Sequence, residues 1–182
     1  MPAHVLLHIC CGPCAIYPLR KLKSQGYEVT ALFFNPNIHP LKEYLLRAEA
    51  AETVTEAEQV RLIRLDKEYN PTDYLRTTVY REEQRCLLCY QRRMERTRNI
   101  ACKGGFDYFS TSLLFSKHQK HSLLESLGQS LNSSKCGFLY QDFRSGWRQG
   151  RSQAREMGIY MQNYCGCIYS EFERFQKELK IS

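Results

Sequence analysis

Near its N-terminus the chain reads Val5-Leu6-Leu7-His8-Ile9-Cys10-Cys11-Gly12-Pro13-Cys14. The apolar first half predicts a buried strand, which the Gly-Pro pair ends. Residues 16–22 then show apolar side chains three apart, as in a helix. The cysteines are therefore expected on a strand-to-helix turn. In open α/β sheets ligands bind at such turns, beside a helix N-terminus that favours anions such as thiolates. Ordinary buried cysteines are the alternative, since they are common in apolar strands.

The segments that follow alternate between strand-like and helix-like patterns. Residues 29–34 predict a second buried strand, rich in β-branched and aromatic side chains, and residues 35–40 form a turn-forming loop with two prolines. Residues 41–54 have the 3.6-residue period of a helix, and residues 62–65 predict a third strand. This order predicts a parallel sheet with right-handed crossovers.

An Arg-rich segment, residues 69–103, interrupts the alternation and carries Cys86 and Cys89 at the start of a helical pattern. The remaining expected elements are a strand at 107–111, a helix starting at Ser116 by capping-box spacing, a loop at 132–135, a short strand at 138–140, a helix ending before Gly158, and a final amphipathic helix with Tyr169, Phe172, Phe175 and Leu179 facing inward. We therefore expect residues 1–182 to form one α/β domain, a Rossmann-like parallel sheet with a cysteine-rich, metal-binding helical insertion.

Composition narrows the class of protein. The chain has 182 residues, 43% hydrophobic and 25% charged, which is enough for a sizeable core. The sequence predicts neither a membrane span nor a signal peptide, so we expect a cytoplasmic protein. In a reducing compartment nine cysteines favour metal or redox chemistry over structural disulfides. The net charge of +7 suggests an anionic partner, although solubility alone is the plainer explanation.

Seven of the cysteines fall into three local groups. Four thiolates satisfy a [4Fe–4S] cluster, and two local pairs supply them: Cys10, Cys11, Cys86 and Cys89. The three that remain, Cys14, Cys165 and Cys167, are expected to act at the substrate and not to be needed for the cluster. They hold a second iron, or Cys165 and Cys167 cycle between dithiol and disulfide. Zinc is the rival metal. Cys102 and Cys136 lie outside the groups, and we interpret them as structural.

Basic residues lie close to two of the cysteine groups. Arg144, Arg148, Arg151 and Arg155 are spaced to form one stripe on a helix, and a second basic region covers residues 81–98. Aromatic residues are interleaved with both, a combination that suits a single-stranded RNA loop. We expect RNA contacts from these arginines: Arg85, Arg92, Arg144, Arg148 and Arg151. A solvated helix face is the alternative.

The motifs resemble those of one family in order along essentially the whole chain. The matching segments are residues 8–14, 35–40, 85–90, 142–144 and 164–167. They look like the signature of the cobalamin-independent epoxyqueuosine reductases, the QueH family. The resemblance implies a Rossmann-like core of the adenine-nucleotide α-hydrolase type, a [4Fe–4S] cluster and a nearby second metal site. It also implies tRNA as the substrate, with the epoxide of epoxyqueuosine reduced at the wobble position. One departure is the absence of an expected proline after Ser116.

This chemistry agrees with the residues taken on their own. Removing an epoxide oxygen needs two electrons, protons and an electrophile on the oxygen, and the electrons must come from an external donor. Asp142, Tyr140 or Tyr164 is a candidate to relay protons. The unpaired bases of an anticodon loop can enter a pocket. The expected catalytic residues are thus Cys14, Cys165, Cys167, Asp142 and Tyr164.

Two other functions fit part of the pattern. An ATP-dependent, iron–sulfur tRNA-thiolating enzyme can share this core, but residues 10–14 occupy the place of the glycine- and serine-rich loop it needs. A non-enzymatic zinc protein that binds RNA is the second alternative.

Overall fold

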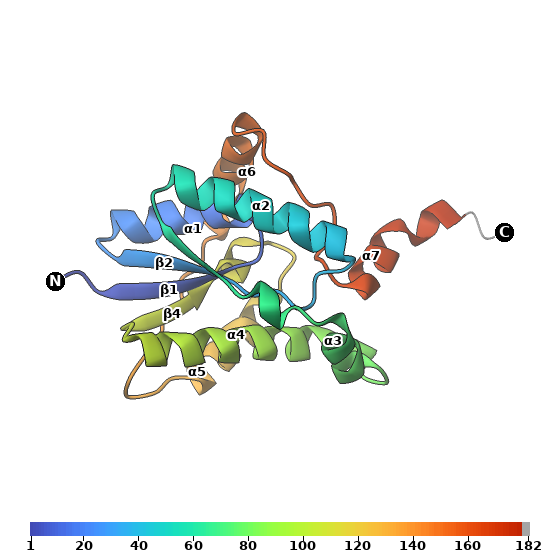
Figure 1. Ribbon diagram of the computed structural model, residues 1–182, viewed down its shortest axis with the longest axis horizontal. Helices are drawn as coiled ribbons and strands as arrows, with labels where there is room; N and C mark the ends of the chain where they lie inside the picture. The colour runs from blue at the N-terminus through green and yellow to red at the C-terminus, as the bar shows by residue number, and fades with distance from the viewer. Residues whose placement is uncertain (180–182) are drawn as a thin grey trace.

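The computed structural model describes residues 1–179, which form a five-stranded parallel sheet between two layers of helices (Figure 1). The strand order is β3-β2-β1-β4-β5. The strands are β1 (His4–Ile9), β2 (Glu28–Phe33), β3 (Arg61–Arg64), β4 (Tyr108–Thr111) and β5 (Gly137–Phe138). The expected Rossmann-like parallel α/β class is therefore confirmed. Because the chain runs outward from β1 to β3 and returns at β4, the order reverses between β1 and β4, where such sheets bind ligands.

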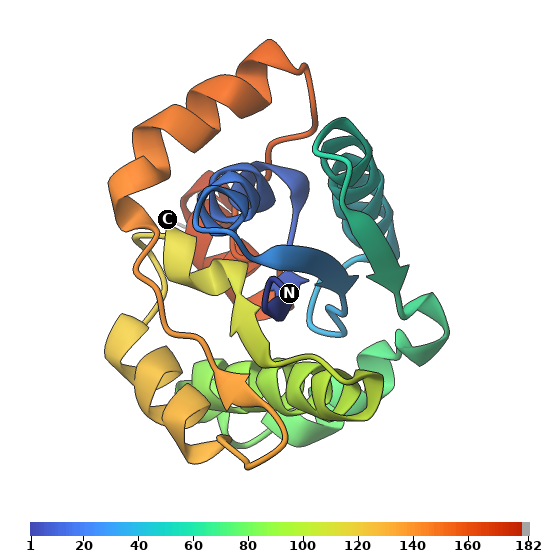
Figure 2. The same ribbon diagram turned by 90° about the vertical axis from the view of Figure 1, so that its left-hand side faces the viewer.

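The helices cover both faces of the sheet, as Figures 1 and 2 show. On one face lie α1 (Gly12–Ser24), α2 (Leu41–Ala57) and α6 (Trp147–Glu156), and on the other α4 (Arg85–Gly104) and α5 (His121–Ser130). Two short helices, α3 (Pro71–Thr78) and α7 (Ile168–Phe175), lie at the carboxyl edge of the sheet. The remaining helical elements are short 3₁₀ helices: η1 (Asp66–Glu68), η2 (Glu82–Gln84), η3 (Ser112–Phe115), η4 (Arg144–Gly146) and η5 (Gln176–Leu179).

The central strand β1 is the most deeply buried part of the sheet. Its residues Val5 to Ile9 are all buried, and it pairs with β2 on one side and β4 on the other. An uninterrupted apolar run is typical of a strand covered on both faces. Its one buried polar side chain, His8, has no exposed surface and contacts Thr111 Oγ1 at 3.0 Å. Burial lowers the pKa of His8 to about 4, so the ring is neutral at pH 7.

Three expectations about the helices need correction. The helix expected at Ser116 begins at His121, because Ser116 closes the preceding 3₁₀ turn and its hydroxyl accepts a hydrogen bond from His118 N. The final helix does not bury its apolar face, since Phe172 is 54% exposed and Leu179 is 56% exposed. The segment 69–103 is only partly an insertion, because α4 is itself the crossover helix between β3 and β4.

Gly12 allows the close approach of α1 and α2 that places the cysteine turn. A Cβ atom on Gly12 would lie 2.4 Å from the carbonyl oxygen of Ala50 in α2. Real Cβ contacts with backbone atoms do not reach this distance, so only glycine fits without moving a helix.

Gly12→Ala should therefore lower the free energy of unfolding by about 1–3 kcal/mol, the usual cost of overpacking. Urea unfolding followed by circular dichroism measures this loss. Ser24→Ala, at the exposed end of the same helix, is the control and should change stability by less than about 0.5 kcal/mol. Equal effects of the two substitutions would contradict the packing argument.

Candidate metal centre

Three cysteine sulfurs converge where β1 meets α1. The Sγ atoms of Cys10, Cys11 and Cys14, here called the three-thiol set, all lie within 4.8 Å of one another, and all three residues are buried. Cys10 and Cys11 sulfurs are 3.7 Å apart. Cys11 is the N-cap residue of α1 and Cys14 lies in its first turn, so the helix N-terminus favours negative charge at the set. Within residues 1–179 no other three such metal-ligating side chains converge to this extent.

The environment of the three-thiol set stabilises bound sulfur anions. Gln162 Nε2 donates to Cys11 Sγ at 2.9 Å and to Cys14 Sγ at 3.4 Å. Hydrogen bonds from the neighbouring thiols lower the pKa of Cys10, whereas burial raises the pKa of Cys11 and the contact with Cys10 raises the pKa of Cys14. Of the three thiols, Cys10 is therefore the one that ionises most readily. A metal that bound all three sulfurs would displace the remaining protons.

A second set of thiols forms next to the first. It comprises Cys86 and Cys89 of α4 with Cys165 and Cys167 of the segment before α7, here called the four-thiol set. Burial raises the pKa of Cys89 to about 12, and negative charge on Cys165, Cys167 and Cys86 acts in the same direction. Cys89 and Cys167 pack together against Tyr74 of α3. Burial raises the pKa of Cys165, and negative charge on Cys10 adds to this effect, so the two sets adjoin.

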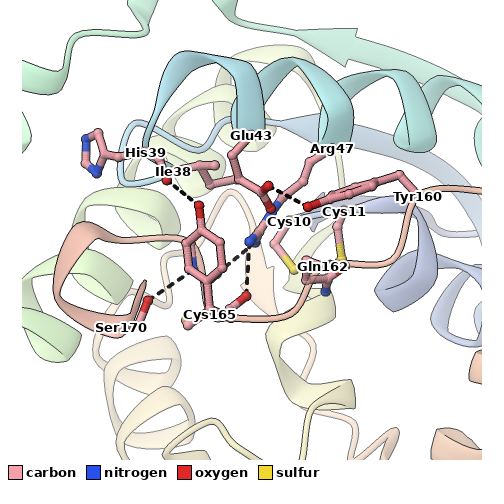
Figure 3. A network of polar contacts seen from close by, with 12 residues as sticks. Cys10, Cys11, Ile38, His39, Glu43, Arg47, Tyr160, Gln162, Cys165 and Ser170 are labelled. Carbon is pink, nitrogen blue, oxygen red and sulfur yellow. Dashed lines mark hydrogen bonds and ion pairs between the residues drawn. The ribbon is translucent and has the colours of Figure 1, made fainter. Parts of the chain in front are cut away.

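A buried arginine ties the C-terminal cysteines to the body of the protein, as Figure 3 shows. Arg47 of α2 is 1% exposed and its Nε donates to Glu43 Oε1 at 2.6 Å. Its Nη1 donates to the carbonyl oxygen of Cys165 at 2.8 Å, and its Nη2 donates to that of Tyr164 at 3.0 Å. The guanidinium thereby fixes a segment about 118 residues away in the chain.

The loop after β2 holds the same segment from the other side. His39 N donates to Gly166 O at 2.7 Å, and the Tyr164 hydroxyl donates back to His39 O. Gly166 has a φ of +133°. A Cβ atom placed on it would lie 3.1 Å from Arg47 Nη1 and 3.1 Å from Ile38 Cγ1. A side chain there would be strained by the backbone and crowded by both neighbours, so glycine is required between Cys165 and Cys167.

The structure groups the expected site residues differently from the sequence interpretation. Cys14 joins Cys10 and Cys11, while Cys86 and Cys89 are not within 4.8 Å of that pair among the described residues. The assignment of Cys10, Cys11, Cys86 and Cys89 to one cluster stays an untested prediction. Among residues 1–179 no three sulfurs of Cys86, Cys89, Cys165 and Cys167 meet that distance either. Cys102 and Cys136 contact each other at the far end of α4, away from both sets.

The other expected residues have partners that limit their roles. The Arg144 guanidinium donates from Nε and Nη2 to both carboxylate oxygens of Asp142, and these hydrogen bonds lower the pKa of Asp142 to about 2. The hydroxyl of Tyr164 is engaged by His39 O, and burial raises the pKa of Tyr164 to about 12. Two of the expected RNA-binding arginines also face carboxylates, Arg85 pairing with Glu173 and Arg92 lying near Asp73.

Sequence reasoning missed two residues that shape the site, Arg47 and Gln162, and it placed a third, Arg93, in the basic region 81–98 expected to contact RNA. Arg47 looks like an ordinary polar position of a helix, and Gln162 like part of a loop. Their importance comes from contacts with residues tens of positions away, such as the 151-residue separation between Gln162 and Cys11. A basic residue four positions after Cys89 on a helix, which lies on the same helix face, is the one local signal that identifies Arg93.

The fold and the three-thiol set define a parallel α/β protein with three cysteines that could hold a metal ion at the switch point of its sheet. The family model described as Epoxyqueuosine reductase QueH matches residues 5–173. The chain belongs to this family.

Two curated relatives match over nearly their whole length. The epoxyqueuosine reductase QueH of Dehalococcoides mccartyi is 34% identical over 178 residues, 97% of this chain and 97% of the relative. That of Thermotoga maritima is 34% identical over 98% of this chain and 95% of the relative. A solved structure described as a predicted subunit of tRNA methyltransferase from Methanocaldococcus jannaschii has a TM-score of 0.53 and 16% identity, covering 97% of this chain and 88% of that one. It supports the fold alone.

Breaking the contact between Arg47 and the C-terminal segment should be costly. Arg47→Met leaves Glu43, which is 7% exposed, without its cation and should lower the free energy of unfolding by about 3–5 kcal/mol. Urea unfolding of the purified protein measures the loss.

Arg20→Met is the matched control, because Arg20 pairs with Glu58 while its own side chain is 45% exposed. It should lower stability by less than about 1 kcal/mol. Similar losses in the two variants would show that the buried contact has no special role.

Proposed function

We propose that this protein is an epoxyqueuosine reductase, which reduces the epoxide of epoxyqueuosine at the wobble position of tRNA and yields queuosine. The observation that carries the proposal is the family match over residues 5–173, together with all seven motif cysteines at the carboxyl edge of the sheet. The reaction consumes two electrons and two protons, opens the epoxide to a cyclopentene and releases the oxygen as water. We place the reaction in the cytoplasm, where an external donor supplies the electrons. No helix of residues 1–179 is long and apolar enough to cross a membrane.

The two thiol sets fit a [4Fe–4S] cluster and a second iron. Cys86, Cys89, Cys165 and Cys167 supply the four thiolates that a cluster requires. The three-thiol set leaves one ligand position open, as catalytic metal sites do. Bound there, these groups supply single electrons and a Lewis acid for the epoxide oxygen. Gln162 Nε2, which donates to Cys11 and Cys14, orients two sulfurs of the three-thiol set.

This division differs from the expected one, and the reason is the contact pattern of Cys89. Cys89 packs with Cys167 against Tyr74, and negative charge on Cys165, Cys167 and Cys86 adds to burial in raising the pKa of Cys89. A redox pair formed by Cys165 and Cys167 is the alternative for those two residues. A redox pair needs only the four irons of the cluster in each chain, whereas the second-iron proposal needs a fifth iron.

Proton delivery needs a group other than Asp142 or Tyr164. The Arg144 guanidinium keeps Asp142 ionised at neutral pH, and the Tyr164 proton is held by a backbone carbonyl. Tyr74 and His39 lie beside the four-thiol set with ring centroids 5.0 Å apart. Both ring nitrogens of His39 are buried without a hydrogen-bond partner in residues 1–179. We assign proton transfer to this pair.

Two cysteine substitutions separate the alternative ligand sets. Cys167→Ala should lose the broad visible absorbance of the cluster and most of its iron and sulfide, because it removes one of four ligands. Cys14→Ala should keep that absorbance and lose one iron. Cys136→Ala is the control and should keep the full metal content. The sequence interpretation predicts an intact cluster in Cys167→Ala, and full iron and sulfide there would overturn our division.

The substrate proposal also names the arginines that contact RNA. Among residues 1–179 neither Arg148 nor Arg151 of α6 forms an ion pair, and Arg151 lies 5.3 Å from the centre of the Trp147 ring. These two cations and the indole are therefore available to the phosphates and bases of an anticodon loop.

Arg148→Glu with Arg151→Glu should weaken tRNA binding and lower the slope of log affinity against log salt by about two, one for each lost phosphate contact. Binding is measured by filter retention at several salt concentrations. Arg61→Glu, exposed at the opposite edge of the sheet, is the control for net charge. If both proteins lose the same affinity and slope, α6 does not contact the RNA.

A further inference from the structure

Arg93 occupies the inner face of α4, directly after the cysteines of the four-thiol set. Cys86, Cys89 and Arg93 are spaced three and four residues apart, which places them on one side of the helix. The side chain of Arg93 is 1% exposed, and it is one of the largest fully buried side chains. A cation so deeply buried is unfavourable unless it is paired.

A chain of hydrogen bonds fixes one end of this guanidinium. Its Nη1 donates to Asn35 Oδ1 at 3.3 Å. Asn35 Nδ2 donates to the carbonyl oxygen of Ile9 at 2.9 Å, and Asn35 Oδ1 also lies 3.2 Å from His8 Nε2. The orientation of Arg93 is therefore set by the end of β1, immediately before Cys10.

Two other N–H donors of the Arg93 guanidinium have no acceptor among the described residues. Within residues 1–179 its Nε and Nη2 have no hydrogen-bond partner. Arg47 has the same exposure but uses Nε, Nη1 and Nη2 on Glu43, Cys165 and Tyr164. The difference indicates that Arg47 completes the protein fold, whereas Arg93 lacks an acceptor that residues 1–179 do not provide.

The charges around Arg93 indicate where that acceptor lies. Burial lowers the pKa of the Arg93 guanidinium, but negative charge on Cys89, Cys165 and Cys10 raises it above its usual value. Cys89 and Cys165 belong to the four-thiol set and Cys10 to the three-thiol set. The guanidinium therefore lies between the two sets and keeps its charge.

We propose that Arg93 is a positioning residue for both metal groups, and that its free Nε–H and Nη2–H donate hydrogen bonds to their sulfurs and offset their negative charge. The inference rests on the metal-binding part of the proposed function. It does not depend on which substrate is reduced.

A positive charge from Arg93 beside a cluster changes the reduction potential of that cluster. A [4Fe–4S] cluster gains one negative charge when it is reduced, so a fixed positive charge and N–H donors favour the reduced form. Arg93→Met should therefore shift the cluster's one-electron reduction equilibrium at least tenfold toward the oxidised form. This corresponds to a midpoint potential about 59 mV more negative.

The test compares Arg93→Met with Arg96→Met by an anaerobic redox titration of the reconstituted holoenzyme, monitored by electron paramagnetic resonance. Arg96 lies on the same helix but pairs with Glu68, so it controls for the loss of a charge from α4. We expect a negative shift in Arg93→Met and the wild-type potential in Arg96→Met. Thermal unfolding of the metal-free proteins gives a second readout. Arg93→Met should be at least as stable as the wild type, because it removes a buried cation with unsatisfied donors.

An unchanged potential in Arg93→Met, or the same shift in Arg96→Met, would overturn the proposal. So would a metal-free Arg93→Met protein that is clearly less stable than wild type, since it would show that Arg93 serves the fold. If Arg93→Met keeps its stability but does not take up the cluster, Arg93→Gln is titrated against the same criteria. Failure of the wild-type enzyme to reduce epoxyqueuosine in tRNA would refute the proposed function while leaving this comparison of potentials valid.

Discussion

The site depends on the hydrogen bonds from the Arg47 guanidinium to the carbonyl oxygens of Cys165 and Tyr164. They join α2, the helix between β2 and β3, to the segment that carries Cys165 and Cys167. Glu43 balances the charge of Arg47 and also accepts a hydrogen bond from the Tyr160 hydroxyl. A buried ion pair of this kind contributes little net stability, but it specifies one position for the chain that it holds. The thiol geometry follows from that position.

The topology explains why cysteines so far apart in the sequence can share one centre. Parallel strands end at the same edge of the sheet, so the turn after β1, the loop after β2 and η3 after β4 all meet there. The crossover helix α4 starts at this edge, and it carries Cys86, Cys89 and Arg93 on its first turns. Because these residues lie on a helix packed against β1 and β4, the scaffold positions them without relying on a flexible loop.

Much of the fold could be predicted because its signals are local. The apolar run of β1, the Gly-Pro break and the periodicity of α2 each lie within a few residues. The start of α5 and the exposed face of α7 could not be predicted, since the alternative turn at Ser116 and the absence of a covering element over Phe172 within residues 1–179 are tertiary facts. The seven cysteines could be identified as a set from spacing. The proposed division into sets could not, because it depends on the packing of Cys167 against Cys89 and Tyr74, which lie in distant segments.

The central claim is that this edge of the sheet holds two metal groups on separate thiol sets. Anomalous diffraction at the iron edge from anaerobically grown crystals tests it most directly. We predict a four-iron peak bonded to the sulfurs of Cys86, Cys89, Cys165 and Cys167, and a separate iron at Cys10, Cys11 and Cys14. One cluster bonded to Cys10, Cys11, Cys86 and Cys89, or zinc in place of iron at both sets, would contradict the account.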